Sequence, residues 1–353
     1  MTSKIIGVGN YIPSETITNI FFEKHQFLDE KGITLKQNNT IIAEKLKEIT
    51  GIEERRYASK NQVTSDLGFI AAKEAIENSG IDPETLDYII FAHNFGDVVS
   101  DTIQSDMVPS LASRVKHLLQ IKNNYCVAYD VLFGCPGWIE GVIQANAFIK
   151  SGIAKRCLVI GAETLSRVVD IHDRDSMIYA DGAGAAILEI NNEDDEGIKS
   201  HLSASFTLNE KDYLFFGKSY NTESCPNVKY IKMIGRKIYE FALSNVPEAM
   251  KKCYDESGYT IDKLNKIIIH QANEKMDEAI VKRFFQLYDK PVPDHIMPMV
   301  IEKLGNSSVA TIPTLLTMIM NDELASHEIN KGDVVLFASV GAGMNVNAIV
   351  YKF

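Results

Sequence analysis

Three side chains that could carry acyl-transfer chemistry are spread along the chain: Cys135, His270 and Asn306. Cys135 follows an apolar run over residues 125–129 and precedes a helical pattern that starts near Pro136. This order predicts a strand, a tight turn and a helix, with the thiol at the helix N-terminus. Such a position is expected to lower the pKa of the thiol and to favour the nucleophilic thiolate. The plain alternative is a small apolar residue in a tight corner, because free cysteines are often buried.

The other two side chains stand where a ligand could reach them. His270 ends the apolar strand predicted over 264–270, and ligands gather at the carboxyl ends of strands in open α/β sheets. Asn306 lies in the turn-like segment 305–308, although a simple turn with a helix cap would use the same residues. The small residues 341–343 predict a turn whose backbone N–H groups could approach a ligand. Together these parts indicate acyl transfer by a nucleophile, neutral hydrogen-bond donors and an oxyanion hole.

Helical and strand-like patterns alternate along the whole chain, which predicts parallel strands with helices on both faces of a sheet. The length of 353 residues and the 45% hydrophobic content allow two domains or two halves of one α/β unit. We place the boundary in the acidic, polar run 191–196. The expected halves are residues 1–195, which carry the cysteine, and residues 196–353, which carry the histidine and the asparagine.

The bulk composition excludes several classes of protein. The net charge of −11 argues against nucleic acid or an anionic membrane as the main partner. No apolar run reaches the roughly 18 residues that span a bilayer, and the N-terminus reads as a first strand rather than a signal peptide. We therefore expect a cytoplasmic protein without membrane insertion. The five cysteines are odd in number and lack CxxC pairs, which is typical of reduced thiols rather than of disulfides or a zinc site. Adjacent side chains such as those of 172–175 rarely converge on one ion, so no metal is expected.

The motifs around these residues resemble those of the β-ketoacyl-acyl carrier protein synthase III family, which are condensing enzymes of the thiolase fold. The resemblance covers nearly the whole chain. It rests on the segments IIGVGNYIP, TGIEERRYA, HDRDSMIYADGAGAAIL, HQANEKM, GNSSVATIP and GAGMNVNAIVYKF, and on the turn at Cys135. It implies two similar halves with mixed, mostly parallel sheets in a five-layer αβαβα arrangement, and a homodimer.

The resemblance also implies a role for each candidate. Cys135 would carry the acyl group as a thioester. His270 and Asn306 would hydrogen-bond the thioester carbonyl of a malonyl extender and stabilise the enolate formed when carbon dioxide leaves. The backbone amides of Cys135 and Gly343 would form the oxyanion hole. No acid stands at position 306, which favours decarboxylation over the deprotonation of an acetyl group. No cofactor is implied beyond the substrates, which are acyl-CoA or acyl-ACP and malonyl-ACP.

Residues outside the catalytic set are expected to bind the carrier of the acyl group. Arg174 matches a family arginine near the cofactor entrance, and the surface after His270 would dock an acidic carrier protein. The residues expected to contact substrate or carrier are Arg174, Gly235, Asn273, Lys275, Lys282 and Arg283. On charge alone, the basic residues after His270 also fit a solvated helix face.

The chain departs from the family pattern in ways that concern the acyl donor. Pro136 follows the nucleophile where a small residue is usual, and Trp138 is the only tryptophan, so the family's adenine-stacking tryptophan has no counterpart. A specialised ketosynthase that condenses or cyclises β-ketoacyl thioesters in secondary metabolism is therefore an alternative. A papain-like cysteine protease shares the order Cys, His, Asn. A non-catalytic thiolase-fold partner subunit is the third alternative.

Overall fold

Two mixed β-sheets form the framework of the protein, whose computed structural model describes residues 2–192 and 195–353. The first sheet has the order β1-β7-β6-β4-β5, in which β6, β4 and β5 run parallel and β7 pairs antiparallel with both β1 and β6. The second has the order β11-β12-β13-β8, in which only β11 and β12 are parallel. The strands are β1 (Thr2–Tyr11), β4 (Tyr88–Ala92), β5 (Val127–Val131), β6 (Arg156–Thr164), β7 (Asp181–Asn191), β8 (Gly197–Ser205), β11 (Leu264–Ile269), β12 (Val334–Gly341) and β13 (Asn345–Lys352).

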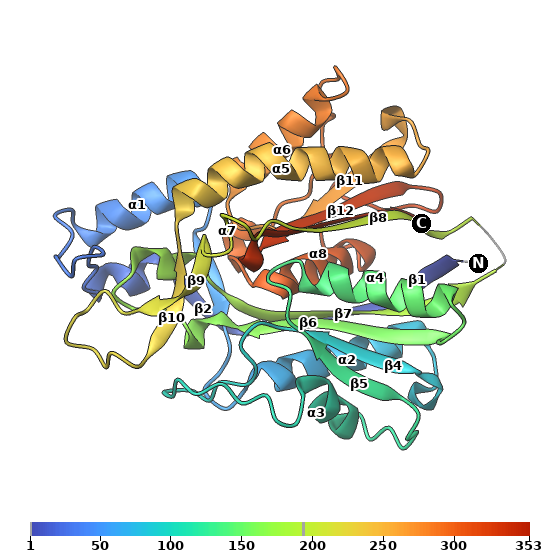
Figure 1. Ribbon diagram of the computed structural model, residues 1–353, viewed down its shortest axis with the longest axis horizontal. Coiled ribbons are helices and arrows are strands. Elements are labelled where there is room, and N and C mark those ends of the chain that lie inside the picture. Colours follow the sequence, from blue (N-terminus) through green and yellow to red (C-terminus); the bar gives the residue numbers. More distant parts are fainter. Residues whose placement is uncertain (1, 193–194) are drawn as a thin grey trace.

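Helices cover both faces of each sheet, which gives the five layers that Figure 1 shows edge-on. The middle layer lies between the two sheets, one outer layer covers the first sheet, and the other covers the second. The middle helices are α4 (Gly137–Lys150) and α8 (Thr311–Met320), and the outer ones are α2 (Thr64–Ser79) and α3 (Leu111–Leu118) on the first sheet and α5 (Gly235–Glu256) and α6 (Glu274–Gln286) on the second.

The middle layer is apolar nearly all round because both sheets press on it. Trp138 on α4 and Leu315 on α8 are buried in one cluster with Val159 of the first sheet and Phe337 of the second. The indole N–H of Trp138 donates to the Val159 carbonyl at 3.2 Å, so this tryptophan is a core residue rather than a stacking platform for a cofactor. The strands that carry the catalytic candidates are thereby fixed from both sides.

A smaller lobe lies beside one end of the two sheets, on the left in Figure 1. Its strands form two-stranded pairs, β2 with β3 and β9 with β10. Its elements are β2 (Glu15–Thr18), α1 (Asn39–Thr50), β3 (Glu54–Tyr57), β9 (Leu214–Lys218) and β10 (Lys229–Met233), and the short helix α7 (Ile301–Leu304) packs on β3. This lobe supplies one wall of the cavity described below.

The predicted mixed α/β architecture is confirmed. Strands of the first sheet all precede residue 192 and strands of the second all follow residue 196, while the division into two domain-like halves stays a prediction. The exact boundary at residues 195 and 196 stays a prediction, since residues 193–194 lie outside the described chain, as does Met1. No helix in the described ranges is both long and apolar enough to cross a membrane.

Candidate active site

Cys135 sits in a turn that joins β5 to α4, close to the predicted position. Gly134 has φ 67°, a left-handed conformation that favours glycine, and Pro136 is the cap residue before the helix. The turn packs against the end of β12: a methyl group added at Gly341 would lie 2.4 Å from the backbone nitrogen of Cys135. Glycine at 341 is therefore required by the close approach of these two segments.

Burial dominates the ionisation of the Cys135 thiol. It raises the pKa to about 11, while a hydrogen bond from Ser308 acts in the opposite direction and the charge of Glu163 raises the pKa further. The predicted lowering of this pKa is wrong, because the loss of water around a thiolate outweighs the favourable start of one helix. The Cys135 thiol is therefore protonated at neutral pH, and a nucleophilic role would require help to ionise it.

His270 directly follows β11 and is itself only 3% exposed. Its backbone N–H donates to the Ala338 carbonyl of β12 at 2.9 Å, which holds the residue at the carboxyl end of two parallel strands. Burial lowers the pKa of the imidazole to about 4, so the ring is neutral at physiological pH. A neutral imidazole can donate one hydrogen bond to a substrate oxygen but is a poor base.

Asn306 is held by hydrogen bonds at both ends of its backbone. Its N–H donates to the Ile178 carbonyl at 3.0 Å, and its carbonyl accepts from the N–H of Ala180 at 2.8 Å. The side-chain Oδ1 accepts from the backbone N–H of Ser308 at 2.8 Å, which fixes the amide so that its NH₂ group is the free end. The preceding Gly305 has φ 65°, and an added methyl group there would lie 2.8 Å from the Cβ of Arg55.

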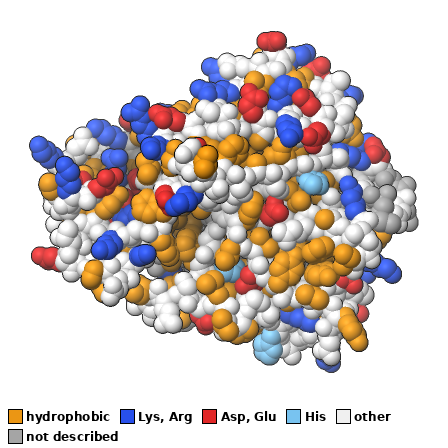
Figure 2. Space-filling view, in the orientation of Figure 1, with side chains coloured by type: hydrophobic (Ala, Val, Ile, Leu, Met, Phe, Trp, Pro, Cys, Tyr) orange, Lys and Arg blue, Asp and Glu red, His pale blue; other side chains and the backbone are white. Residues whose placement is uncertain are grey.

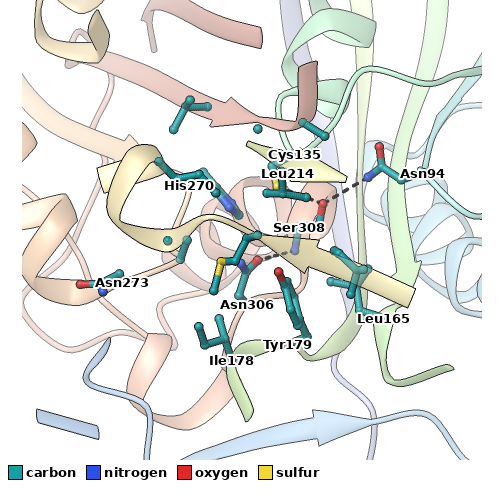
Figure 3. Close-up of a pocket in the computed structure, with 18 of the residues that line it drawn as sticks. Asn94, Cys135, Leu165, Ile178, Tyr179, Leu214, His270, Asn273, Asn306 and Ser308 are labelled. Atoms are coloured by element: carbon teal, nitrogen blue, oxygen red, sulfur yellow. Dashed lines mark hydrogen bonds between the residues drawn. The ribbon is translucent and has the colours of Figure 1, made fainter. Parts of the chain in front are cut away.

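These three side chains line one cavity of about 320 Å³ and point toward a common space in Figure 3. Apolar side chains make up most of its wall; they come from the lobe, from adjoining loops, and from α5, α6 and the end of β12. In Figure 2 hydrophobic side chains gather near β9 and β10, with Lys and Arg side chains around them. The apolar members of the wall are Phe95, Leu165, Ile178, Leu214, Phe215, Phe216, Ile231, Met233, Ile238, Met276, Val340 and Met344.

The Gly-rich turn approaches Cys135 through its first residues. Gly341 and Ala342 line the cavity, whereas Gly343 follows them with a left-handed φ of 76°. A methyl group added at Gly343 would lie 3.0 Å from the side chain of Asn345. The predicted role of the Gly343 amide stays a prediction, and Ala342 is a second candidate for that donor.

The residues expected to bind a carrier fall into two places. Gly235 and Asn273 line the cavity and also a surface groove of about 870 Å³, so they mark the opening between the two. Arg174 lines the same groove and is 60% exposed. Lys275, Lys282 and Arg283 lie on α6, and Arg283 is partly engaged because its guanidinium donates to the Leu243 carbonyl at 2.9 Å. Asp173, which precedes Arg174 in the sequence and lines the same groove, forms an ion pair with Lys232 at 2.9 Å.

Three polar side chains form a hydrogen-bonded chain to the thiol that the motifs do not predict. The hydroxyl of Ser308 donates to the Cys135 sulfur at 3.2 Å, and Asn94 connects that hydroxyl to the buried Glu163. Asn94 lies just after β4 and Glu163 lies near the end of β6, but nothing in their sequence spacing relates either residue to position 308. Arg236, which lines the groove, was also missed.

Comparison with known proteins identifies the family. A family model described as 3-oxoacyl-[acyl-carrier-protein (ACP)] synthase III matches residues 129–205, and the model of its C-terminal part matches residues 254–353. The chain is 32% identical to the β-ketoacyl-[acyl-carrier-protein] synthase III of Ehrlichia ruminantium (strain Gardel), over 97% of this chain and 96% of the relative. The chain belongs to the 3-oxoacyl-ACP synthase III family. The synthase III of Aquifex aeolicus (strain VF5) is 30% identical over the full length of both chains.

Solved structures of synthase III enzymes have the same fold. The crystal structure of the Aquifex aeolicus VF5 enzyme covers 99% of this chain at 29% identity, with a TM-score of 0.81. The Thermus thermophilus enzyme gives the same TM-score at 28% identity. The protein is thus a condensing enzyme, an acyltransferase of the thiolase fold, and the papain-like alternative is wrong.

Within residues 2–192 and 195–353, no group of three or more His, Cys, Asp or Glu side chains could hold a metal ion. The expectation that catalysis needs no metal stays a prediction.

Proposed function

We propose that this synthase III joins a Cys135-bound acyl group to a malonyl thioester by decarboxylative Claisen condensation. The observation that carries the proposal is the convergence of Cys135, His270 and Asn306 in one apolar cavity whose described lining includes no Asp or Glu. A condensation that removed a proton from an acetyl group would need a strong base there. His270, with its pKa lowered to about 4 by burial, is too weak a base for that task.

In the first half-reaction the sulfur of Cys135 attacks the carbonyl of an acyl thioester. The new C–S bond replaces the bond to the leaving thiol, which takes up the proton that Cys135 loses. The backbone amides of Cys135 and of the 341–343 turn stabilise the tetrahedral oxyanion. The product is an acyl-enzyme and a free coenzyme A or carrier thiol.

In the second half-reaction a malonyl thioester occupies the emptied cavity. The neutral imidazole of His270 and the NH₂ group of Asn306 donate to its thioester carbonyl, where negative charge develops as carbon dioxide leaves. The enolate carbon then attacks the acyl carbonyl, the bond to Cys135 breaks, and a 3-oxoacyl thioester departs. Neutral donors suit this step because they stabilise an oxyanion without having to be buried as ions.

The groove outside the cavity is the proposed path of the carrier. Its lining includes Arg174 and Arg236, and the exposed Lys275 lies beside Asn273 at the opening. We propose that these cations and Lys282 on α6 receive an acidic acyl carrier protein or the phosphates of coenzyme A. If variants that replace these cations lose activity with carrier-bound substrate but keep activity with a coenzyme A thioester, the surface binds the carrier protein.

Homodimerisation through β5 is the proposed assembly. β5 is the edge strand of the first sheet, and the side chains of Tyr125 and Val127 beside and on it are 90% and 46% exposed. The nearby loop exposes Val108 at 86%. An unpaired apolar edge of this kind is normally covered. Light scattering after size exclusion should give twice the chain mass, and Val127→Asp with Tyr125→Asp should give a monomer.

Cytoplasmic localisation is proposed because all five cysteines are free thiols in the structure, which suits a reducing compartment.

A specialised acyl donor is the second candidate function, because Phe95, Leu214 and Phe216 give the cavity a bulky apolar wall. Rates with a donor series from acetyl to long-chain thioesters would separate it from a housekeeping acetyl donor.

Acyl loading tests the central assignment. Incubation with an acyl-CoA or acyl-ACP should add one acyl mass to the peptide that contains Cys135 and none to the exposed Cys225, which serves as an internal control. Cys135→Ala should abolish loading without changing the unfolding temperature by more than a few degrees. Loading elsewhere, or none with any donor, would contradict the proposal, and it would leave a non-catalytic partner subunit as the better account.

A further inference from the structure

A chain of buried polar side chains runs from the first sheet to the Cys135 sulfur. The Asn94 NH₂ group donates to Glu163 Oε1 at 2.6 Å and to the Ser308 hydroxyl at 3.3 Å, and that hydroxyl donates to Cys135 Sγ at 3.2 Å. Figure 3 shows Asn94, Ser308 and Cys135 in a row. Ser308 contacts the thiol directly, and Asn94 and Glu163 connect to it through Ser308 from two other parts of the sequence.

The direction of every bond in this chain follows from Glu163. Glu163 Oε1 accepts from the Asn94 NH₂ group both when the carboxyl is ionised and when its proton is on Oε2, so in either state the amide turns its NH₂ group toward Oε1. The second hydrogen of the same NH₂ group then points to Ser308 and occupies a lone pair of the hydroxyl oxygen. The hydroxyl hydrogen is left free to point at the sulfur.

Ser308 is held in a backbone conformation that serves this contact. Its φ of 52° is left-handed, which is uncommon for a residue other than glycine. The bond from its N–H to Asn306 Oδ1 at 2.8 Å keeps it there. The same turn therefore orients Asn306 toward a substrate and the Ser308 hydroxyl toward the nucleophile.

We propose that Glu163 and Asn94 are positioning residues that fix the direction of the Ser308 hydroxyl so that it donates to the sulfur of Cys135. A donor aimed at the sulfur stabilises the thiolate, which burial otherwise disfavours. The inference rests on the proposed role of Cys135 as nucleophile and adds the groups that make its ionisation easier.

The charge state of Glu163 decides how well the arrangement works. Burial is the main cause that raises the pKa of Glu163 to about 8; the hydrogen bonds from Asn94 oppose it and the charge of Asp181 acts in the same direction, so the carboxyl is mostly neutral at pH 7. Its second oxygen, Oε2, is buried and has no partner among the described residues, so it can carry the proton while Oε1 still accepts from Asn94. A neutral carboxyl spares the thiolate an adjacent negative charge. The other titratable groups at the thiol are His270, which is neutral, and the buried phenol of Tyr179.

The test is the alkylation rate of Cys135 by iodoacetamide at pH 7, followed by mass spectrometry of its peptide because Cys225 is also exposed. Ser308→Ala and Asn94→Leu should each slow the alkylation of Cys135 about tenfold, which corresponds to a rise of about one unit in the pKa of the thiol. The double variant should react no more slowly than either single variant. Glu163→Leu should give the same loss, whereas Glu163→Gln keeps the accepting oxygen and should stay within about twofold of wild type. The matched control Ser307→Ala removes the neighbouring hydroxyl and should change nothing.

Several results would overturn the inference. The inference would be contradicted if Ser308→Ala reacted within twofold of the wild-type rate. It would also be contradicted if the effects of Ser308→Ala and Asn94→Leu multiplied in the double variant, or if Glu163→Gln reacted as slowly as Glu163→Leu. Circular dichroism melting of each variant identifies any that fail to fold, and those are replaced by Asn94→Ala or Glu163→Ala. Because the assay uses no acyl donor or extender, its failure would leave the condensation proposal untouched.

Discussion

Lys232 is a buried cation whose removal should destabilise the wall of the active-site cavity. Its ammonium is 2.6 Å from Asp170 and 2.9 Å from Asp173, and it lies 3.4 Å from the centre of the Tyr220 ring. All three charged side chains are at least 93% buried. Lys232→Met would leave two facing carboxylates without a counter-charge, which costs about 3–5 kcal/mol in the free energy of unfolding. Urea unfolding at pH 7 measures this loss, and Lys229→Met on the exposed side of β10 should stay within about 0.5 kcal/mol.

The loss should depend on pH with a defined sign. Burial alone would raise the pKa of Asp170, but hydrogen bonds from Lys232 and from the backbone of Tyr220 bring it below its ordinary value. A lowered folded-state pKa gives stability that is present above about pH 4 and is lost as the pH falls through the folded value. The difference between wild type and Lys232→Met should therefore shrink on acidification. Adding Asp170→Asn and Asp173→Asn to Lys232→Met should restore most of the stability. A loss below 1 kcal/mol, or one independent of pH, would refute this account.

Three further predictions concern the site itself. Gly341→Ala places a methyl group 2.4 Å from the Cys135 nitrogen, so acyl loading should fall at least 100-fold, and normal loading would contradict the close packing. Because burial raises the pKa of Cys135 to about 11, its alkylation rate should rise about tenfold per pH unit from pH 7 to 8 and less steeply above pH 8 as Glu163 ionises, whereas a plateau below pH 8 would contradict that pKa. Lys275→Glu with Lys282→Glu should raise the KM for carrier-bound substrate at least fivefold more than the KM for a coenzyme A thioester, and equal effects would remove the docking role.

Local patterns in the sequence predicted much of the fold. A cap at Thr64 or Ser65 and apolar residues at helical spacing predict a helix that runs to about Ser79, and the structure has α2 over Thr64–Ser79 with Val63 as its cap. The turn at Cys135 is predicted because Pro136 can start a helix directly after a strand. The patterns over residues 197–232, by contrast, predict no element, although β8, β9 and most of β10 lie there. The burial patterns of β9 and β10 do not alternate cleanly, since these strands face a cavity rather than a core.

The site was predicted only as far as motifs reach. Cys135, His270 and Asn306 do share one cavity, but the pKa of the thiol was predicted in the wrong direction, because burial depends on the lobe that closes over it. Asn94 contacts Glu163, which is 69 positions away in the sequence, and Ser308, which is 214 positions away. No local sequence pattern encodes contacts over such separations.

Separation of the two half-reactions tests the central claim most directly. Acyl-loaded enzyme, freed of excess donor, is mixed with a malonyl thioester while carbon dioxide and 3-oxoacyl product are both measured. Wild type should release one carbon dioxide per product formed and per acyl group lost from Cys135. Asn306→Ala should load normally but decarboxylate about 100- to 1,000-fold more slowly, because it lacks one donor to the enolate oxygen. Undiminished carbon dioxide release by Asn306→Ala, or loss of the acyl group as free acid without product, would contradict the account.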